Sequence, residues 1–305
     1  MTALPWEPAA GSVTVETVHV DGIPVSARVL AVTRPRAVLV ALHGGAVNSA
    51  YYDSRRPSRS SLLLAGAALG YTVIALDRPG YGASAPYGEH LSAPDARVDL
   101  TYGAIDALLA SRSRGAGVFV MAHSMGCVLA VRLAADPRGA ELLGLEIAAT
   151  GLVPHPDAAF MDSLISTGEP GPRYADRPRR AMLQEALWNP ARLYPPGAAA
   201  DLGIAASPGY EGPEIGGWIG ALPKLAAGVR VPVHYTLGDH ERVWSTGPAA
   251  MAEVGGLFTA SPRVVTAEQA DAAHNLSLGW SALSYHLKVL SFAEECAVAR
   301  ENASE

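Results

Sequence analysis

The chain has 305 residues, of which 49% are apolar and 17% charged, and its formal net charge is −6. This size and composition are typical of a folded globular protein with one large or two modest domains. The acidic balance argues against a dedicated nucleic-acid-binding protein, which normally needs a basic face, and no apolar run approaches the roughly 18 to 20 residues of a membrane span.

The first predicted element is a β-hairpin. Ser12–Val20 and Ile23–Val32 carry β-branched residues in partial alternation, and Asp21-Gly22 separates the two runs. Both loop residues tolerate the positive φ angles that a two-residue hairpin turn requires. We therefore expect the chain to enter its sheet through an antiparallel pair.

Short apolar runs with little alternation follow, separated by stretches with helical spacing. Such runs are typical of strands that are covered on both faces, as in a parallel sheet. The succession of strands and helices predicts an α/β sheet with right-handed crossovers. The expected strands are 36–42, 71–76, 117–122, 142–148, 231–237 and 263–267, and the expected helices are 60–69, 93–109, 124–135 and 278–298.

Residues 153–229, rich in Pro, Gly and Arg, separate two strands that should be neighbours. Helical pieces are expected at 158–165 and 176–188, the second ended by Asn189-Pro190. An insertion at the carboxyl end of a strand lies where open α/β sheets bind ligands, so we interpret this one as a lid. A helical insertion without substrate contact is the alternative. The predicted organisation is a core of residues 1–152 and 230–305 with a lid of residues 153–229.

The strand at 117–122 leads through His123 and Ser124 directly into a helix. A serine in so sharp a turn has a strained backbone and presents its hydroxyl above the amino end of the helix. The positions two before and two after it must be small. Gly126 meets this demand, and Ala122 is a mild departure from the glycine of G-x-S-x-G. A simple helix N-cap is the alternative for Ser124, because serine is a favoured capping residue.

A serine hydroxyl is a poor nucleophile unless a base and an orienting acid accompany it. His274 lies in a loop before the C-terminal helix, and Asp239 and Glu241 follow the strand at 231–237. Only tertiary folding could bring these residues to Ser124. The order along the chain is serine, acid and histidine.

Four landmarks in this order make the chain resemble the α/β-hydrolases, the superfamily of esterases, lipases, proline iminopeptidases and thioesterases. The resemblance covers roughly residues 12–298 and is loose in the lid. It implies an α/β-hydrolase fold with a mostly parallel sheet of about eight strands, helices on both faces and an inserted helical lid. The landmarks are Leu42-His43-Gly44-Gly45, Asp77–Ser84, Ala122–Gly126 and Ala273-His274-Asn275.

The resemblance implies that Ser124 is the nucleophile and His274 the general base. In these enzymes the acid commonly lies three residues after a glycine. Counted from Gly238, that position is Glu241, and Asp239 is the alternative acid.

The resemblance also implies two backbone donors for the oxyanion. One is the N–H of Met125, the residue after the nucleophile, and the other comes from the loop after Leu42. We assign the second donor to Gly45, with Ala46 as the alternative. The segment Asp77–Ser84 is interpreted as a mainly structural turn under the site.

No metal and no cofactor are expected. The histidines outside the site lack metal-ligand spacing, and Gly80-Tyr81-Gly82 is only part of a dinucleotide-binding loop. Cys127 and Cys296 cannot form a disulfide framework, and residues 1–11 show no secretory signal. A reduced, cytoplasmic setting is therefore predicted.

The predicted function is that of a serine hydrolase that cleaves an ester, thioester or amide of a small, mostly apolar acyl substrate through an acyl-enzyme. An acyl-enzyme partitions between acceptors, so an acyltransferase or cyclising thioesterase of a biosynthetic pathway is the alternative. A non-catalytic ligand-binding protein of the same fold is a further one.

Several arginines of the expected lid could indicate what kind of acyl donor the protein binds. Their guanidinium groups could hold the phosphates of a coenzyme A thioester or of a carrier protein's phosphopantetheine arm. A solvated helix face, balanced by Asp176 and Glu185, is the interpretation that we favour for them. They are Arg173, Arg177, Arg179, Arg180 and Arg192.

Overall fold

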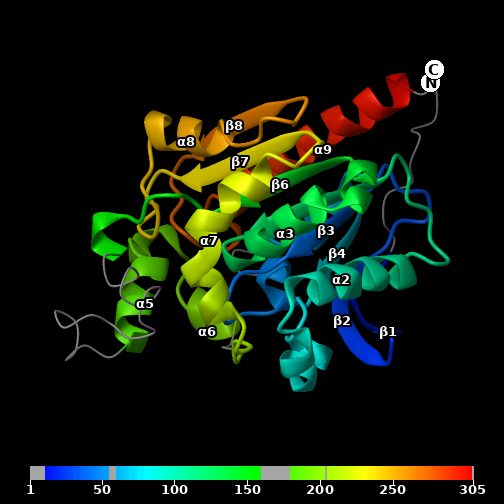
Figure 1. The fold of residues 1–305 in the computed structure, drawn as a ribbon, viewed down its shortest axis with the longest axis horizontal. Helices are drawn as coiled ribbons and strands as arrows, with labels where there is room; N and C mark the ends of the chain where they lie inside the picture. Colours follow the sequence, from blue (N-terminus) through cyan, green and yellow to red (C-terminus); the bar gives the residue numbers. More distant parts are fainter. Residues whose placement is uncertain (1–10, 55–59, 159–178, 203–204, 304–305) are drawn as a thin grey trace.

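The computed structural model describes residues 11–54, 60–158, 179–202 and 205–303 (Figure 1). Its centre is an eight-stranded sheet in the order β1-β2-β4-β3-β5-β6-β7-β8. The strands are β1 (Thr14–Val20), β2 (Ile23–Leu30), β3 (Val38–Leu42), β4 (Thr72–Leu76), β5 (Val118–His123), β6 (Gly144–Ala148), β7 (Val233–Gly238) and β8 (Val264–Gln269).

Strands β1 and β2 form the expected hairpin. They pair antiparallel, with Val20 opposite Ile23, so that only two residues connect them. Asp21 and Gly22 have φ angles of 50° and 82°. The hairpin turn therefore has the positive φ angles that the Asp-Gly sequence predicts.

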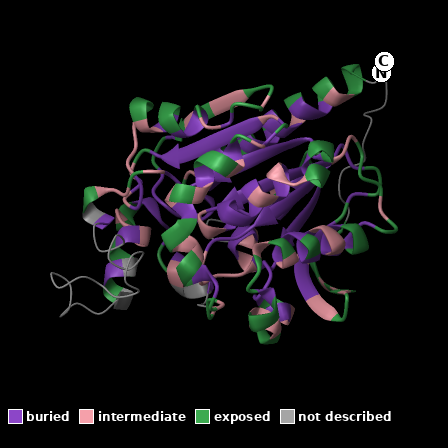
Figure 2. Ribbon diagram, viewed as in Figure 1, coloured by how far each residue is buried: buried purple, intermediate pink, exposed green. Residues whose placement is uncertain are grey.

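Antiparallel pairing joins β2 to β4, and every pairing from β4 across to β8 is parallel. All residues of β3, β4, β5, β6 and β7 are buried, whereas the edge strands β1 and β8 are partly exposed (Figure 2). Continuous apolar runs thus form strands covered on both faces. The predicted mostly parallel sheet of about eight strands is confirmed.

Helices cover both faces of the sheet. Successive side chains of a strand point to opposite faces: Val40 packs in the cluster with α2 and α3, and Leu39 in the cluster with α1 and α9. No helix of the described part of the chain is long and apolar enough to cross a bilayer. The helices are α1 (Leu62–Ala68), α2 (Pro94–Leu108), α3 (Met125–Ala135), α5 (Arg179–Trp188), α6 (Ala198–Leu202), α7 (Glu211–Ala226), α8 (Pro248–Gly255) and α9 (Ala282–Asn302).

The segment between β6 and β7 contains α5, α6 and α7. Helix α5 ends before Asn189-Pro190, as expected, and the helix expected at 158–165 lies outside the described residues beyond Ala158. Helix α7 was not predicted, because its four glycines and two prolines lower its intrinsic helix propensity. It forms because Trp218, Leu222 and Ala226, spaced four apart, are buried in the core beside α3.

Candidate active site

Ser124 is the single residue between the end of β5 and the start of α3. Its φ and ψ angles are 51° and −119°, a backbone conformation that residues other than glycine rarely adopt. The turn is tight, because a Cβ added to Gly126 would lie 2.3 Å from the carbonyl oxygen of Leu42. The Ser124 hydroxyl makes no capping hydrogen bond to α3. The helix N-cap alternative is therefore wrong.

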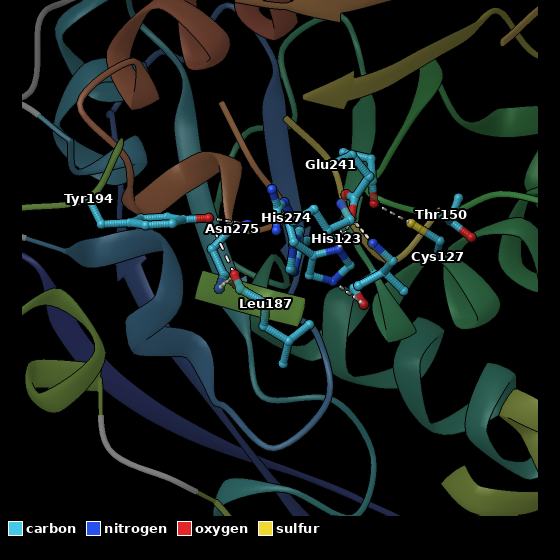
Figure 3. A network of polar contacts seen from close by, with 12 residues as sticks. His123, Cys127, Thr150, Leu187, Tyr194, Glu241, His274 and Asn275 are labelled. Carbon is cyan, nitrogen blue, oxygen red and sulfur yellow. Dashed lines mark hydrogen bonds and ion pairs between the residues drawn. The ribbon is translucent and has the colours of Figure 1, made fainter. Parts of the chain in front are cut away.

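His274 lies between Ser124 and Glu241, although these residues are far apart in the sequence. Its Nε2 is 3.0 Å from Ser124 Oγ, and its Nδ1 is 2.9 and 3.0 Å from the two Glu241 carboxylate oxygens. An ionised carboxylate only accepts hydrogen bonds, so Nδ1 carries the proton and Nε2 accepts the serine hydroxyl. Figure 3 shows the His274 ring directed toward Glu241.

The two candidate acids have different partners. The carboxylate of Glu241 also accepts the backbone N–H groups of Arg242 and Val243, at 2.9 and 2.8 Å. The carboxylate of Asp239 instead accepts the N–H groups of Asp271 and Ala272, both at 3.0 Å. The structure thus brings Glu241 to the histidine ring, and Asp239 ties the loop after β7 to the loop that carries the histidine.

His123 supports the backbone of the site. Its Nε2 is 2.8 Å from the carbonyl oxygen of His274, to which it donates, and its ring stacks on Tyr51 with centroids 4.6 Å apart. Burial lowers the pKa of His123 well below the ordinary range, so this ring stays neutral. From the sequence, no role was assigned to His123, and its position beside Ser124 was the one signal for this contact.

The loop after β3 lies beside the serine. A Cβ added to Gly44 would be 3.4 Å from Ser124 Cβ, and one added to Gly45 would be 3.2 Å from Met125 Cγ. The N–H of Ala46 donates to the Tyr81 hydroxyl at 3.0 Å. The Ala46 N–H is therefore already bonded, and Gly45 lies beside Met125; the assignment of Gly45 and Met125 as oxyanion donors stays a prediction.

The segment between β6 and β7 reaches both loops of the site. The Asn275 side-chain amide donates to the Leu187 carbonyl at 2.9 Å, and the Asn275 N–H donates to the Tyr194 hydroxyl at 3.1 Å (Figure 3). On the other side, the N–H of Ala205 donates to the Ala46 carbonyl at 2.9 Å. Leu187 and Tyr194 therefore contact the histidine loop, and Ala205 contacts the loop after β3.

Of the five arginines in the segment between β6 and β7 that the sequence singled out, the structure describes the side chain of Arg192. Arg173 and Arg177 lie outside the described residues, and of Arg179 and Arg180 only the backbone, in α5, is described. The guanidinium of Arg192 is exposed and lies 3.4 Å from His240 Nε2. The role of these arginines in binding a thioester stays a prediction.

The thiols and the other potential ligands show no further chemistry. Cys127 is fully buried and its thiol donates to the Ala148 carbonyl, and burial raises its pKa, so the reactive thiolate does not form. Cys296 is also buried and free. Within residues 11–54, 60–158, 179–202 and 205–303, no three His, Cys, Asp or Glu side chains gather as a metal site would need.

Comparison with known proteins identifies the family to which the chain is similar. The profile of the alpha/beta hydrolase family matches residues 38–283. No curated protein matches the chain.

Many solved structures share the fold at low identity. A lipase in an open form is 17% identical, with a TM-score of 0.67 over 94% of this chain and 99% of that one. A thermostable carboxyl esterase from Bacillus coagulans in complex with glycerol is 18% identical, with a TM-score of 0.63 over 94% and 100%. A thioesterase domain from the curacin biosynthetic pathway is 16% identical, with a TM-score of 0.56 over 93% and 99%. At these identities the similarity concerns the fold.

Proposed function

The chain belongs to the alpha/beta hydrolase family, and from this premise we propose that it is a serine hydrolase that cleaves an ester or a thioester through an acyl-enzyme. The observation that carries the proposal is the continuous line of hydrogen bonds from Glu241 through His274 to Ser124. The similar folds of a lipase, a carboxyl esterase and a thioesterase domain support these two substrate classes. An amide of the same acyl group remains a related substrate.

In the proposed mechanism, Ser124 Oγ attacks the carbonyl carbon while its proton moves to His274 Nε2. Glu241 holds the ring in the tautomer that can accept this proton and stabilises the imidazolium that results. The developing oxyanion accepts hydrogen bonds from the N–H groups of Met125 and Gly45. His274 then returns the proton to the departing alcohol or thiol. A water molecule, deprotonated by the same ring, then attacks the acyl carbonyl carbon; the bond from that carbon to Ser124 Oγ breaks, and the ring returns the proton to Ser124 Oγ.

We further propose that residues 153–229 form the lid of this site. The contacts of Leu187, Tyr194 and Ala205 with the two active-site loops support this location. A lid excludes water, which strengthens the electrostatic interactions of the transition state. By excluding water, a lid would also favour transfer of the acyl group to another acceptor. The enzyme would then be an acyltransferase or a cyclising thioesterase.

The proposal is tested by a series of p-nitrophenyl esters of increasing chain length, set beside acyl-coenzyme A thioesters. The parent should hydrolyse at least one series, and Ser124→Ala should lower that rate by about a thousandfold or more. Product analysis with added alcohol or amine separates hydrolysis from acyl transfer. A folded parent that turns over no substrate would favour a ligand-binding protein, and equal rates in both proteins would exclude Ser124 as the nucleophile.

A further inference from the structure

A second buried cluster of charged and polar side chains adjoins the candidate oxyanion loop. Arg78 and Tyr81 follow β4, and Glu211 begins α7 in the inserted segment. Only 2%, 1% and 3% of these residues are exposed. Charged groups are seldom buried so deeply unless they are paired. The mechanism above gives none of the three a role.

The cluster forms hydrogen bonds with the loop on both sides of Gly45. The Arg78 guanidinium donates to the Gly44 carbonyl at 2.9 Å, and the Tyr81 hydroxyl accepts the Ala46 N–H at 3.0 Å. Glu211 joins these two anchors, because its carboxylate accepts from Arg78 at 2.5 Å and from the Tyr81 hydroxyl at 2.8 Å. Together with His43, whose Nδ1 lies 2.8 Å from the Gly44 carbonyl oxygen, side chains from two other segments therefore hold the peptide groups on both sides of Gly45.

The loop needs this support. Ala46 has a φ angle of 57°, a left-handed conformation that is strained for a residue with a Cβ. The inserted segment also bonds to the same residue, because the Ala205 N–H donates to the Ala46 carbonyl at 2.9 Å. A strained conformation persists only when its surroundings stabilise it. Here the Ala46 N–H is bonded to Tyr81, and the Ala46 carbonyl is bonded to the inserted segment.

The cluster also sets the charge beside the loop. A Cβ added to Gly45 would lie 3.2 Å from Met125 Cγ and 3.4 Å from Glu211 Oε2, so the carboxylate is a close neighbour of the candidate oxyanion donors. An uncompensated carboxylate there would repel the oxyanion. Burial acts to lower the pKa of Arg78, but Glu211, together with Tyr81 and Tyr210, outweighs this effect and the pKa is raised. Burial raises the pKa of Tyr81 to about 12. Arg78 therefore stays charged and Tyr81 neutral.

We propose that Arg78, Tyr81 and Glu211 are positioning residues for the oxyanion loop: they fix the Gly45 peptide against Met125 and neutralise the carboxylate that lies beside it. The inference rests on the proposed function, since it concerns the same reaction. It gives helix α7 a part in the geometry of the reaction, and it changes the interpretation of Asp77–Ser84, which holds the oxyanion loop as well as forming a turn.

The test compares Tyr81→Phe with Tyr102→Phe, using the p-nitrophenyl ester that the parent hydrolyses fastest. Each change removes one tyrosine hydroxyl bonded to backbone. Tyr102 is only partly buried, and its hydroxyl donates to the Leu133 carbonyl, away from the site. Misplacement of a group by about 1 Å can cost about a hundredfold in rate, so we expect Tyr81→Phe to lower kcat by about ten- to a hundredfold with little change in KM. Tyr102→Phe should keep the parent kcat.

A second readout separates positioning from structure. Trifluoromethyl ketones form a tetrahedral adduct on the serine, whose oxygen occupies the oxyanion hole. The affinity for 1,1,1-trifluorooctan-2-one should fall in Tyr81→Phe by the same factor as kcat, at a temperature where circular dichroism shows a folded protein. A merely structural role would lower the melting temperature and leave both quantities at the parent value.

The neutralisation of Glu211 by Arg78 is tested with the variants Arg78→Met and Glu211→Gln. Arg78→Met leaves a bare carboxylate beside Gly45 and should lose more kcat than Glu211→Gln, and adding Glu211→Gln to it should restore part of the loss. Parent kcat in folded Tyr81→Phe, or no restoration in a folded double variant, would overturn the inference while Ser124→Ala still confirms the hydrolase. If the parent itself hydrolyses no ester or thioester, the proposed function fails, and the inference with it.

Discussion

Two buried glutamate–histidine pairs lie near opposite ends of strand β7. Glu241, just beyond the end of the strand, pairs with His274. His234, the second residue of the strand, pairs through its Nδ1 with Glu146 of β6. All four side chains are buried. In both sites a buried imidazole lies beside a buried carboxylate, and in this respect the two sites are alike.

They differ in what surrounds the pair. His274 Nε2 faces the hydroxyl of Ser124, which a strained turn presents. In the second pair, Glu146 accepts a hydrogen bond from the Tyr285 hydroxyl at 3.0 Å, and the Thr236 hydroxyl lies 3.3 Å from His234 Nδ1, the nitrogen that faces Glu146. A carboxylate beside a buried imidazole is therefore not by itself a sign of catalysis. The hydroxyl held at the far nitrogen is what makes one pair a candidate for catalysis.

The largest expected contrast is between Glu241→Gln and Glu146→Gln. Without its carboxylate, His274 would lose the group that fixes its tautomer, and kcat/KM should fall by about a thousand- to ten-thousandfold. Glu146→Gln should stay within a few-fold of the parent. Steady-state kinetics on folded samples checks the ranking, and Asp239→Asn serves as a second control that should lose far less than Glu241→Gln. A reversed order of Glu241 and Asp239 would contradict the assignment of the acid.

The second pair should instead matter for stability. Glu146→Gln leaves a buried histidine without its counter-ion and weakens the bond to Tyr285, so we expect it to lower the free energy of unfolding by about 3 kcal/mol. Urea unfolding monitored by circular dichroism measures this loss. An unchanged midpoint would show that the pair does not stabilise the fold.

The pH dependence of stability sharpens the same contrast. Burial acts to lower the pKa of His234, but the charge and hydrogen bond of Glu146 outweigh it and raise the pKa. A raised folded pKa gives a contribution that is complete below the unfolded value of about 6.5 and is lost as pH rises through the folded value. The difference in unfolding free energy between the parent and His234→Gln should therefore shrink as pH rises from 6 to 9. A constant difference would contradict a charged His234.

The smallest effect is expected from Thr236→Val. Its hydroxyl lies near a ring nitrogen that is already bonded to Glu146, so the change should cost less than about 1 kcal/mol and leave kcat unaltered. Ser124→Ala removes a hydroxyl of similar size beside the other histidine and should abolish turnover. Comparable losses of activity in the two variants would erase the distinction between the pairs.

Local patterns predicted much of this molecule. The Asp21-Gly22 hairpin, the buried strands and the sharp turn at Ser124 each depend on residues that adjoin in the sequence, and the structure has all three. The resemblance to the α/β-hydrolases, counted from Gly238, also pointed to Glu241, which the structure places against His274. What such patterns could not supply was the pairing of distant residues.

Tertiary contacts account for what was missed. Helix α7 forms against its own low propensity because the core buries Trp218 and Leu222. Arg78 and Glu211 are separated by 133 residues, and neither carries a local signal that names its partner. For the same reason Asp77–Ser84 was predicted as a mainly structural turn, while the structure shows Arg78 and Tyr81 in contact with the loop after β3.

Covalent labelling of the folded protein with a fluorophosphonate, followed by peptide mass spectrometry, tests most directly whether Ser124 is activated. We expect one adduct per chain, on the peptide that contains Ser124, and none in Ser124→Ala. A folded parent that takes up no label, or a Ser124→Ala variant that is labelled as fully as the parent, would contradict the account.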